Sequence, residues 1–457
     1  MFLFLILSIV LIYFSAQPLL VFYSLALLFI LYKLFWRAGE PKVLFIGLAY
    51  FWLSIVVKIF YADFVGLKYE DLSLSYKIVE TTFLALIALL VFAVGIFLTT
   101  KNIQKKVYIS YTETFGYSTT KVISLYVLTT VVSIFLKGIL FVFPAFSQLF
   151  NALIVMKTGL LFLLIHTVYV QKKQMWIIVI IIAVEVILSF VSFFSSFKDI
   201  LITIAVVFSF YPIIVSLKQY VRNIGIVIAT LYLLLIWQTI KPEYRFFLNQ
   251  GTSTQTIQVS TTDALNKIAE LAEKADPFDK DNNTVAQSVE RLSYIEFFSQ
   301  AMVRVPSEKP HENGALWLNN IMHVLVPRIL NPNKKAIDDS QMVNEYCIKQ
   351  VATADKGASW SLGYIAESYI DFGIPFMYIP IFLLGCLVGS IYTLLITKSI
   401  NFVWGFSMVS PLWVYINSNG TPGTKFLGWF LMYLIAFYLI RRFVMKPVDK
   451  FLRGSSE

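Results

Sequence analysis

The chain has 457 residues, of which 58% are hydrophobic and only 14% are charged, and its mean hydropathy is +0.74. A chain this apolar cannot bury its hydrophobic side chains in one water-soluble core, so the composition indicates a polytopic membrane protein and excludes an ordinary soluble domain. The net charge of +10 does not indicate nucleic-acid binding, because the one long polar region of the chain is itself net acidic.

Predominantly apolar runs of about 17 to 25 residues recur along the sequence, and each such run is long enough to cross a bilayer as a helix. Every backbone amide inside a bilayer needs a partner within the protein, so these runs favour helices. We therefore predict an all-α polytopic membrane protein with about twelve transmembrane helices. The expected helices lie near residues 2–16, 18–36, 43–62, 79–99, 122–144, 148–170, 175–195, 199–217, 222–240, 375–397, 402–418 and 426–446.

Lysine and arginine are distributed unequally between the short connectors of these helices. Alternate connectors, together with the C-terminal tail, hold 17 Lys and Arg residues, whereas the opposite set holds only Lys68, Lys77, Lys198 and Lys425. Short basic connectors remain on the cytoplasmic side during insertion. The sequence therefore predicts cytoplasmic termini and a long polar region that projects out of the cytoplasm.

The pattern divides the chain into three parts. Residues 1–240 are expected to form a bundle of about nine helices, and residues 373–457 to form about three more helices and a basic cytoplasmic tail. Between them, residues 241–372 are expected to form an extracytoplasmic loop subdomain that carries 13 of the 37 Lys and Arg residues and 17 of the 27 Asp and Glu residues. A loop this long usually has a function of its own, such as handling a substrate.

Within this loop, apolar periodicity predicts three helices: Asp263 to Lys274, Thr284 to about Val305, and Ala315 to Leu325. Pro306 and Pro310 are expected to end the second helix. The remainder of the loop, up to Ser359, is polar and is expected to be irregular.

Cationic side chains in the loop and at its membrane boundary suggest a site for a lipid diphosphate. A guanidinium holds phosphate oxygens bidentately, whereas an ammonium acts as a point charge. The alternatives are that the lysines only reach the membrane interface, and that Arg291 forms a surface ion pair with Glu290 or Glu296. The candidate diphosphate-binding residues are Arg291, Arg304, Arg328, Lys198, Lys241 and Arg245.

Three residues are candidates for catalysis: Glu367, His311 and His323. A carboxylate near a low-dielectric boundary has a raised pKa, as a general base requires, and a histidine titrates near neutral pH. The alternative for Glu367 is a helix-start carboxylate that the helix dipole stabilises. No HExxH, Walker or GxGxxG motif is present, so we expect no metal, no nucleotide and no other cofactor.

Ionisable residues also lie inside predicted helices, including Glu185, His166, Lys137 and Lys157. Such residues are costly in a bilayer and are often functional, so they motivate a transporter as an alternative function. The simpler interpretation is that they pair with groups on neighbouring helices.

The chain resembles the Wzy-type polymerases of bacterial O-antigen and exopolysaccharide repeat units. The resemblance lies in the many membrane helices with one large outward loop in the C-terminal half, in the segment from Val326 to Lys334, and in the segment from Gly363 to Gly373. At an outer helix end where such polymerases often carry glycine and arginine, this chain has Phe194-Ser195-Ser196-Phe197-Lys198-Asp199, so Lys198 would meet a phosphate there only as a point charge.

The resemblance implies a metal-independent glycosyltransferase with a GT-C-like fold in the bacterial cytoplasmic membrane. Its donor and acceptor would be polyprenyl-diphosphate-linked oligosaccharides, joined at the outer face of the membrane to build a surface polysaccharide of the cell envelope. It also implies a membrane partner that regulates chain length. Aromatic residues that could stack on sugar rings are Trp317, Trp360 and Tyr364, although packing at the membrane interface is the alternative for them.

Two other functions remain open at this point. An O-antigen ligase would use the same lipid-linked donor with a different acceptor, and a lipid-linked glycan flippase or transporter would move the substrate without chemistry. The sequence shows no inverted repeat of the kind found in many transporters, which argues against the transporter.

Overall fold

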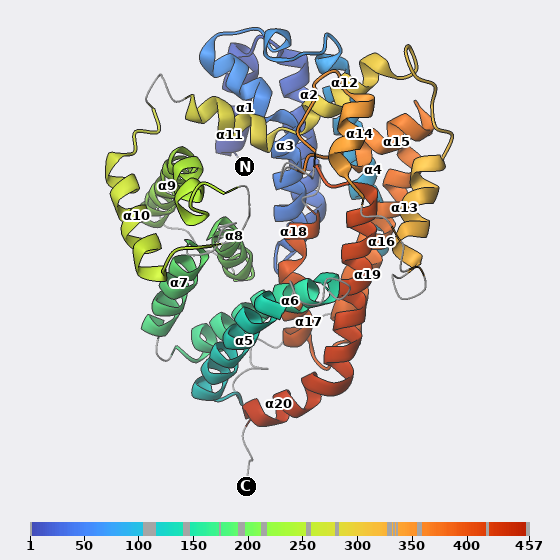
Figure 1. Cartoon of the computed structure of the whole chain (residues 1–457). Coiled ribbons are helices and arrows are strands. Elements are labelled where there is room, and N and C mark those ends of the chain that lie inside the picture. Colours follow the sequence, from blue (N-terminus) through green and yellow to red (C-terminus); the bar gives the residue numbers. More distant parts are fainter. Residues whose placement is uncertain are drawn as a thin grey trace.

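The structure is a computed structural model that describes residues 2–103, 116–139, 147–172, 175–190, 197–211, 217–252, 257–278, 283–326, 331, 334, 337–353, 359–416 and 420–453. The regular structure of these residues is entirely helical, with no strand among them (Figure 1). The prediction of an all-α fold is therefore confirmed for the part of the chain that is described.

Seven helices in the described ranges are long and apolar enough to cross a membrane. They are Pro18–Phe35 (α2), Val43–Val65 (α3), Ile78–Thr100 (α4), most of Thr119–Ile139 (α5), most of Ser147–Gln171 (α6), Tyr378–Lys398 (α16), and a continuous run through Gly423–Ile440 (α19), Arg441–Met445 (η5) and Lys446–Arg453 (α20). At about 1.5 Å per residue, α16 with its 21 residues matches a hydrocarbon layer of about 30 Å. The protein is thus a polytopic helical membrane protein.

Five further helical segments occupy the other positions at which the sequence predicts membrane helices. They are Phe2–Phe14 (α1), Met175–Phe190 (α7), Phe197–Phe208 (α8), Leu217–Leu248 (α9), and the sequence Phe402–Val409 (α17), Ser410–Leu412 (η4) and Trp413–Ile416 (α18). The apolar parts of α7, α8 and α17–α18 are shorter than a membrane span. α9 continues past residue 240 with Pro242 inside it.

α4 and α16 pack together more extensively than any other pair of helices in the described chain. Glycines make this close approach possible: a Cβ on Gly389 would lie 2.8 Å from the Ile96 carbonyl oxygen, and a Cβ on Gly95 would lie 2.8 Å from the Cys386 nitrogen. Gly385 and Gly389 thus serve tight helix packing.

The two helices run parallel, because the carbonyl of Thr99 accepts a hydrogen bond from Thr393 at 2.9 Å while Gly385 lies beside Phe92. Their basic ends, Lys101 and Lys398, therefore lie at the same end of the molecule. At this end Arg37 donates to the Thr100 carbonyl at 3.1 Å. The Ser118 N–H donates to the Leu452 carbonyl of α20, the lowest labelled helix in Figure 1, at 2.8 Å.

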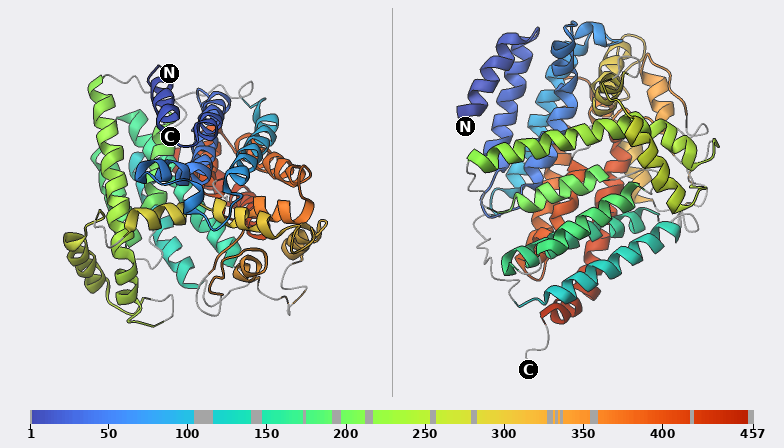
Figure 2. Two further views of the ribbon diagram at one scale, coloured as in Figure 1. Left: turned by 90° about the horizontal axis from the view of Figure 1, so that it is seen from above. Right: turned by 90° about the vertical axis from the view of Figure 1, so that its left-hand side faces the viewer.

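α5 and α6 form a second layer, in which α6 packs against α17 and α19. α7 packs on α8, and α9 carries Thr261–Lys274 (α10), the first helix of the loop, as expected. Figure 2 shows that α5, α6 and α9 cross the direction of α2 to α4 at a steep angle. Gly66, with φ of 72°, ends α3 in the left-handed conformation that favours glycine.

The remaining loop helices lie in the upper half of the molecule as seen in Figure 1. They are Thr284–Leu292 (α11), Ile295–Arg304 (α12), Ala315–Leu325 (α13), Asp339–Tyr346 (α14) and Tyr364–Phe372 (α15). The prediction of one helix from Thr284 to Val305 was wrong, since Ser293 and Tyr294 break it. α12 is buried on every side from Ile295 to Met302, so the pattern of one buried and one exposed face that α11 shows does not continue into α12.

α14 was not predicted, because its sequence DSQMVNEY carries little apolar periodicity. Asp338 caps it by accepting a hydrogen bond from the Ser340 N–H at 3.0 Å. The expectation of irregular structure up to Ser359 is therefore wrong over residues 339–346.

Candidate functional site

Glu367 lies at the junction between the loop helices and the membrane helices, on α15, and its side chain is only 5% exposed. Two donors hold its Oε2 atom: the Gly423 N–H at 2.9 Å and the Asn320 amide nitrogen at 3.0 Å. Oε1 accepts neither of these bonds. The carboxylate is therefore oriented from one side by α13 and α19.

The pKa of Glu367 is raised to about 7, chiefly by burial and to a smaller extent by the negative charges of Asp339 and Asp371. The two hydrogen bonds act in the opposite direction but do not cancel the effect of burial. A carboxylate with a pKa near neutrality is partly ionised at working pH, which is the condition under which a general base is most effective.

Asp371 fixes α13 against α15. Its carboxylate accepts hydrogen bonds from the Leu316 N–H at 3.0 Å and the Trp317 N–H at 2.7 Å, in the first turn of α13. The Trp317 indole N–H donates to the Ser368 hydroxyl at 3.1 Å. These contacts set the position from which Asn320, one turn later, reaches Glu367.

The start of α19 supplies the other wall of the site. A Cβ on Gly423 would lie 2.8 Å from the Asn320 amide nitrogen and 3.0 Å from Oε2 of Glu367, so this position has room only for glycine. Thr424 donates a hydrogen bond to the Asn320 side-chain oxygen, which fixes the amide with its nitrogen toward Glu367. Lys425 forms an ion pair with the buried Asp339.

An apolar cavity of about 200 Å³ lies beside these residues, between α13, α16 and α19. Ile321 directly follows Asn320 on α13, and Leu427 lies one turn after Thr424 on α19, so the cavity adjoins the polar partners of Glu367. Ile321 and Leu325 on its rim are 41% and 63% exposed, and in a membrane these side chains would face lipid. Its lining residues are Ile321, Val324, Leu325, Leu387, Ile391, Leu427, Phe430, Leu431 and Leu434.

Arg291 and Arg245 form the cationic part of the same end of the molecule. Partial burial lowers the pKa of Arg245, and the positive charge of Arg291 lowers it further, so the two guanidinium groups are close enough to repel each other. Arg291 is exposed and makes no ion pair with any described residue. Two neighbouring guanidinium groups suit a ligand that carries more than one negative charge.

The expected ion-pair alternative for Arg291 is not what the structure shows. Glu290 and Glu296 both pair with Lys58 of α3, at 2.8 Å and 2.9 Å. Lys58 is only 2% exposed, and Glu296 also accepts hydrogen bonds from the Leu74 N–H at 2.9 Å and the Gln300 amide at 3.0 Å. This network, which is buried at Lys58 and Glu296, ties α11 and α12 to α3.

Lys58 was not among the predicted functional residues, although a lone lysine inside an apolar run is a signal in itself. Asn320, Gly423 and Asp371 were also missed. Nothing in the local sequence marks Asn320 and Gly423 as partners of Glu367, or Asp371 as a partner of α13.

The cationic and carboxylate parts are connected by one close contact. Tyr294, three residues after Arg291, packs directly against Gly420, which lies three residues before Gly423. The Thr421 carbonyl then accepts a hydrogen bond from the Tyr364 N–H at 2.9 Å, at the start of the helix that carries Glu367.

Residues 45–405 match the family described as Domain of unknown function (DUF8712), which is well over half of the chain. The chain belongs to this family. No curated protein and no solved structure matches it. The matched region contains Glu367, Asn320, Arg245, Arg291 and Lys58, but the start of α19 lies beyond its end.

Arg304 does not belong to the cationic part of the site. It forms an ion pair with Glu308 at 2.7 Å and donates to the Glu345 and Cys347 carbonyls, both at 3.0 Å. These bonds occupy the guanidinium in joining α12 to the segment around α14. The sequence had predicted Arg304 and Arg291 on one helix, but they lie on two, α12 and α11.

The two predicted catalytic histidines, His311 in the connection between α12 and α13 and His323 on α13, make no hydrogen bond to Glu367. His311 Nδ1 is 3.1 Å from the Ile370 carbonyl, and the ring packs against Gly373 at the end of α15. His323 lies on α13 one turn after Asn320, and its carbonyl accepts a hydrogen bond from Lys334. No group of three or more His, Cys, Asp or Glu side chains in the described ranges is placed to hold a metal ion.

Of the other predicted phosphate ligands, Lys241 lies one turn before Arg245 on α9. Arg328 lies outside the described residues, and so does the side chain of Lys198, whose backbone belongs to α8.

The three aromatic candidates differ in exposure. The Tyr364 ring is fully buried among Phe51, Phe92 and Phe426, so it has no face for a sugar. Trp317 is buried, and its indole N–H donates a hydrogen bond to Ser368. Trp360 is 37% exposed and meets Phe297 edge-on, and it therefore keeps an open surface.

Lys157 and Glu185, two of the charged residues inside predicted membrane helices, pair with each other. Lys157 and Glu185 form an ion pair at 2.6 Å, and the Tyr126 hydroxyl donates to the same carboxylate at 2.9 Å. His166 is 2.7 Å from the Tyr211 hydroxyl through Nδ1. The side chain of Lys137 lies outside the described residues.

Proposed function

We propose that the protein is an integral-membrane glycosyltransferase that joins polyprenyl-diphosphate-linked oligosaccharide repeat units into a surface polysaccharide. The observation that carries the proposal is Glu367, a buried carboxylate with a pKa near 7, next to an apolar cavity between membrane helices. A base at the depth of the membrane boundary suits a substrate whose reactive group is tethered to a lipid.

The proposed topology has about twelve transmembrane helices in the bacterial cytoplasmic membrane. The end that carries Glu367 and α11 to α15 faces outward, and the end that carries Lys101, Lys398 and α20 faces the cytoplasm. The clustering of basic residues at the second end supports this orientation, because basic segments stay in the cytoplasm.

In the proposed reaction, ionised Glu367 removes the proton from an acceptor hydroxyl of one lipid-linked repeat unit. The hydroxyl oxygen forms a bond to the anomeric carbon of the donor sugar as the bond from that carbon to the diphosphate oxygen breaks. The diphosphate leaves with the bonding electrons on its lipid, and the proton passes from Glu367 to water. The energy of the step is already stored in the donor, so no nucleotide is required.

Each part of the site has a counterpart in such a substrate. Arg291, with Arg245 beside it, offers planar guanidinium groups to the departing diphosphate, and Lys241 adds a third cation on the same helix as Arg245. The apolar cavity between α13, α16 and α19 suits part of an isoprenoid chain. The open surface of Trp360 suits a sugar ring.

The test is elongation of a lipid-linked oligosaccharide by the purified protein in lipid vesicles. Glu367→Gln keeps acceptors for both hydrogen bonds but removes the base, and we expect it to lower the rate by roughly a hundredfold or more. Glu345→Gln, on an exposed loop carboxylate that pairs with Lys309, is the matched control and should retain the wild-type rate.

Equal rates in the two variants would contradict the role of Glu367. Wild-type protein that transfers the glycan only to an acceptor without a diphosphate lipid would indicate a ligase. Substrate movement across the vesicle without any change in glycan length would indicate a transporter, although the pairing of Lys157 with Glu185 already accounts for two of the charges that motivated that function.

A further inference from the structure

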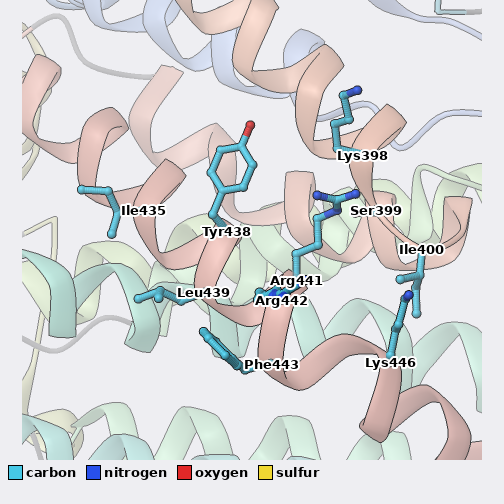
Figure 3. Close-up of a pocket in the computed structure, with 10 residues that line it drawn as sticks. All are labelled: Lys398, Ser399, Ile400, Ile435, Tyr438, Leu439, Arg441, Arg442, Phe443 and Lys446. Atoms are coloured by element: carbon cyan, nitrogen blue, oxygen red, sulfur yellow. The ribbon is translucent and has the colours of Figure 1, made fainter.

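We propose a second binding site, for the phosphate of an anionic phospholipid, at the end of the molecule opposite Glu367. An open cavity of about 780 Å³ lies there between the end of α16 and the segment from α19 to α20 (Figure 3). Its lining residues are Lys398, Ser399, Ile400, Ile435, Tyr438, Leu439, Arg441, Arg442, Phe443 and Lys446.

Four of the ten lining residues are cations, and none of the ten is acidic. Arg441, Arg442, Lys446 and Lys398 are exposed and form no ion pair with any described residue. The nearby carboxylate of Asp449 pairs with Arg453 at 2.8 Å and accepts a hydrogen bond from the Trp404 indole N–H at 3.1 Å. The positive charge of the cavity is therefore available to a ligand.

Figure 3 shows Arg441 and Lys446 extending from the α19–α20 side toward the turn that carries Ser399 and Ile400. Cationic side chains from segments separated in sequence thus line one cavity. The general preference for basic residues on the cytoplasmic side of a membrane does not explain this arrangement, because that preference does not require the basic residues to line the same cavity.

The local helix geometry contributes to this arrangement. Arg441–Met445 is a π-helical segment inserted between α19 and α20, and such wide turns occur often at functional sites. The segment places two arginines next to each other together with Phe443, which is 68% exposed.

The depth of the cavity suits a lipid head group. α16 has 21 residues and α19 has 18, so at about 1.5 Å per residue they extend over about 31 Å and about 27 Å, close to the thickness of about 30 Å of a hydrocarbon layer. The cations that line the cavity lie at the C-terminal ends of these two helices. Ile435 and Leu439 lie six and two residues before the π-helical segment and remain partly exposed, and they offer an apolar wall to an acyl chain beneath the phosphate.

The test compares lipid retention by the full-length protein in mass spectra of the intact complex, using phosphatidylglycerol and phosphatidylcholine as probes. The triple variant Arg441→Gln, Arg442→Gln, Lys446→Gln removes three cations from the cavity. The matched control removes three exposed cations that do not line it, through Lys33→Gln, Lys101→Gln and Lys450→Gln.

We expect wild-type protein and the control to prefer phosphatidylglycerol, and the triple variant to bind it roughly a hundredfold more weakly, at about fivefold for each cation. If the triple variant proves unstable, Lys446→Gln alone should still lower binding by about fivefold. Equal losses in control and triple variant, or equal retention of phosphatidylcholine by the wild type, would overturn the proposal. Displacement of the lipid by an equal concentration of inorganic phosphate would also overturn it, since the site would then recognise a free anion.

Discussion

Replacement of Glu367 by glutamine should make the protein more stable at alkaline pH while removing its activity. The folded-state pKa of about 7 lies above the ordinary value of 4.5, so folding favours the protonated carboxyl. The wild-type protein therefore has the full stability of this group below pH 4.5 and loses it as the pH rises through 7. Glutamine stays neutral at every pH and avoids that loss.

The size of the effect follows from the shift in pKa. A difference of about 2.5 units corresponds to about 3 kcal/mol between pH 4.5 and pH 8, in favour of the variant. For a chain of this length, 1 kcal/mol corresponds to roughly 1 °C in Tm, so we expect the variant to unfold about 3 °C above the wild type at pH 8. At pH 4.5 the two proteins should unfold at nearly the same temperature.

The assay is thermal unfolding followed by tryptophan fluorescence in one lipid composition, at several pH values between 4.5 and 9. Only the difference in Tm between variant and wild type is used, because this difference cancels the titration of all other groups. A variant that is less stable than the wild type by the same amount at every pH would refute the reasoning. Glu367 would then be an ionised structural ligand of Asn320 and Gly423.

Three further outcomes are expected. The elongation rate should rise with pH through about 7, because the base must be ionised, and a rate that is flat or falls over that range in the wild type would contradict the assignment of Glu367. Lys58→Ala leaves Glu296 buried without its partner and should destabilise the protein by roughly 3–5 kcal/mol, as measured by thermal unfolding. Adding Glu296→Gln to this variant should restore part of the lost stability. Wild-type stability of the Lys58→Ala variant would argue against the network. Gly423→Ala should abolish elongation by displacing Asn320, whereas Gly428→Ala, whose Cβ meets only the end of the Gln148 side chain at 3.3 Å, should remain active in the same assay.

The helical class and most of the long helices were predictable from the sequence because apolar length alone determines them. The same signal says little about a helix such as α14, which depends on its Asp338 cap and on neighbours rather than on periodicity. It also missed the break after Leu292, because the change from a half-buried α11 to a fully buried α12 is a property of packing.

The candidate site was predictable only in part. Glu367 and Arg291 stand out in the sequence by charge and position. Their partners do not, because Asn320 and Gly423 are separated from Glu367 by long stretches of chain and are brought to it by helix packing. For Arg304 and Tyr364 the residue type suggested a ligand role that the structure does not support. The Arg304 guanidinium donates hydrogen bonds to backbone carbonyls. The Tyr364 ring is enclosed by phenylalanine rings.

The glycine-mediated contact between α4 and α16 has a consequence for how the protein is made. The two helices are separated by most of the chain, so α4 must enter the membrane long before its main partner has been synthesised. Until then the surface around Gly95 lacks its partner and is open to lipid or to an insertion chaperone. A chain that stops before Tyr378 would keep that surface uncovered, and cellular quality control should degrade it even though its first membrane helices are intact.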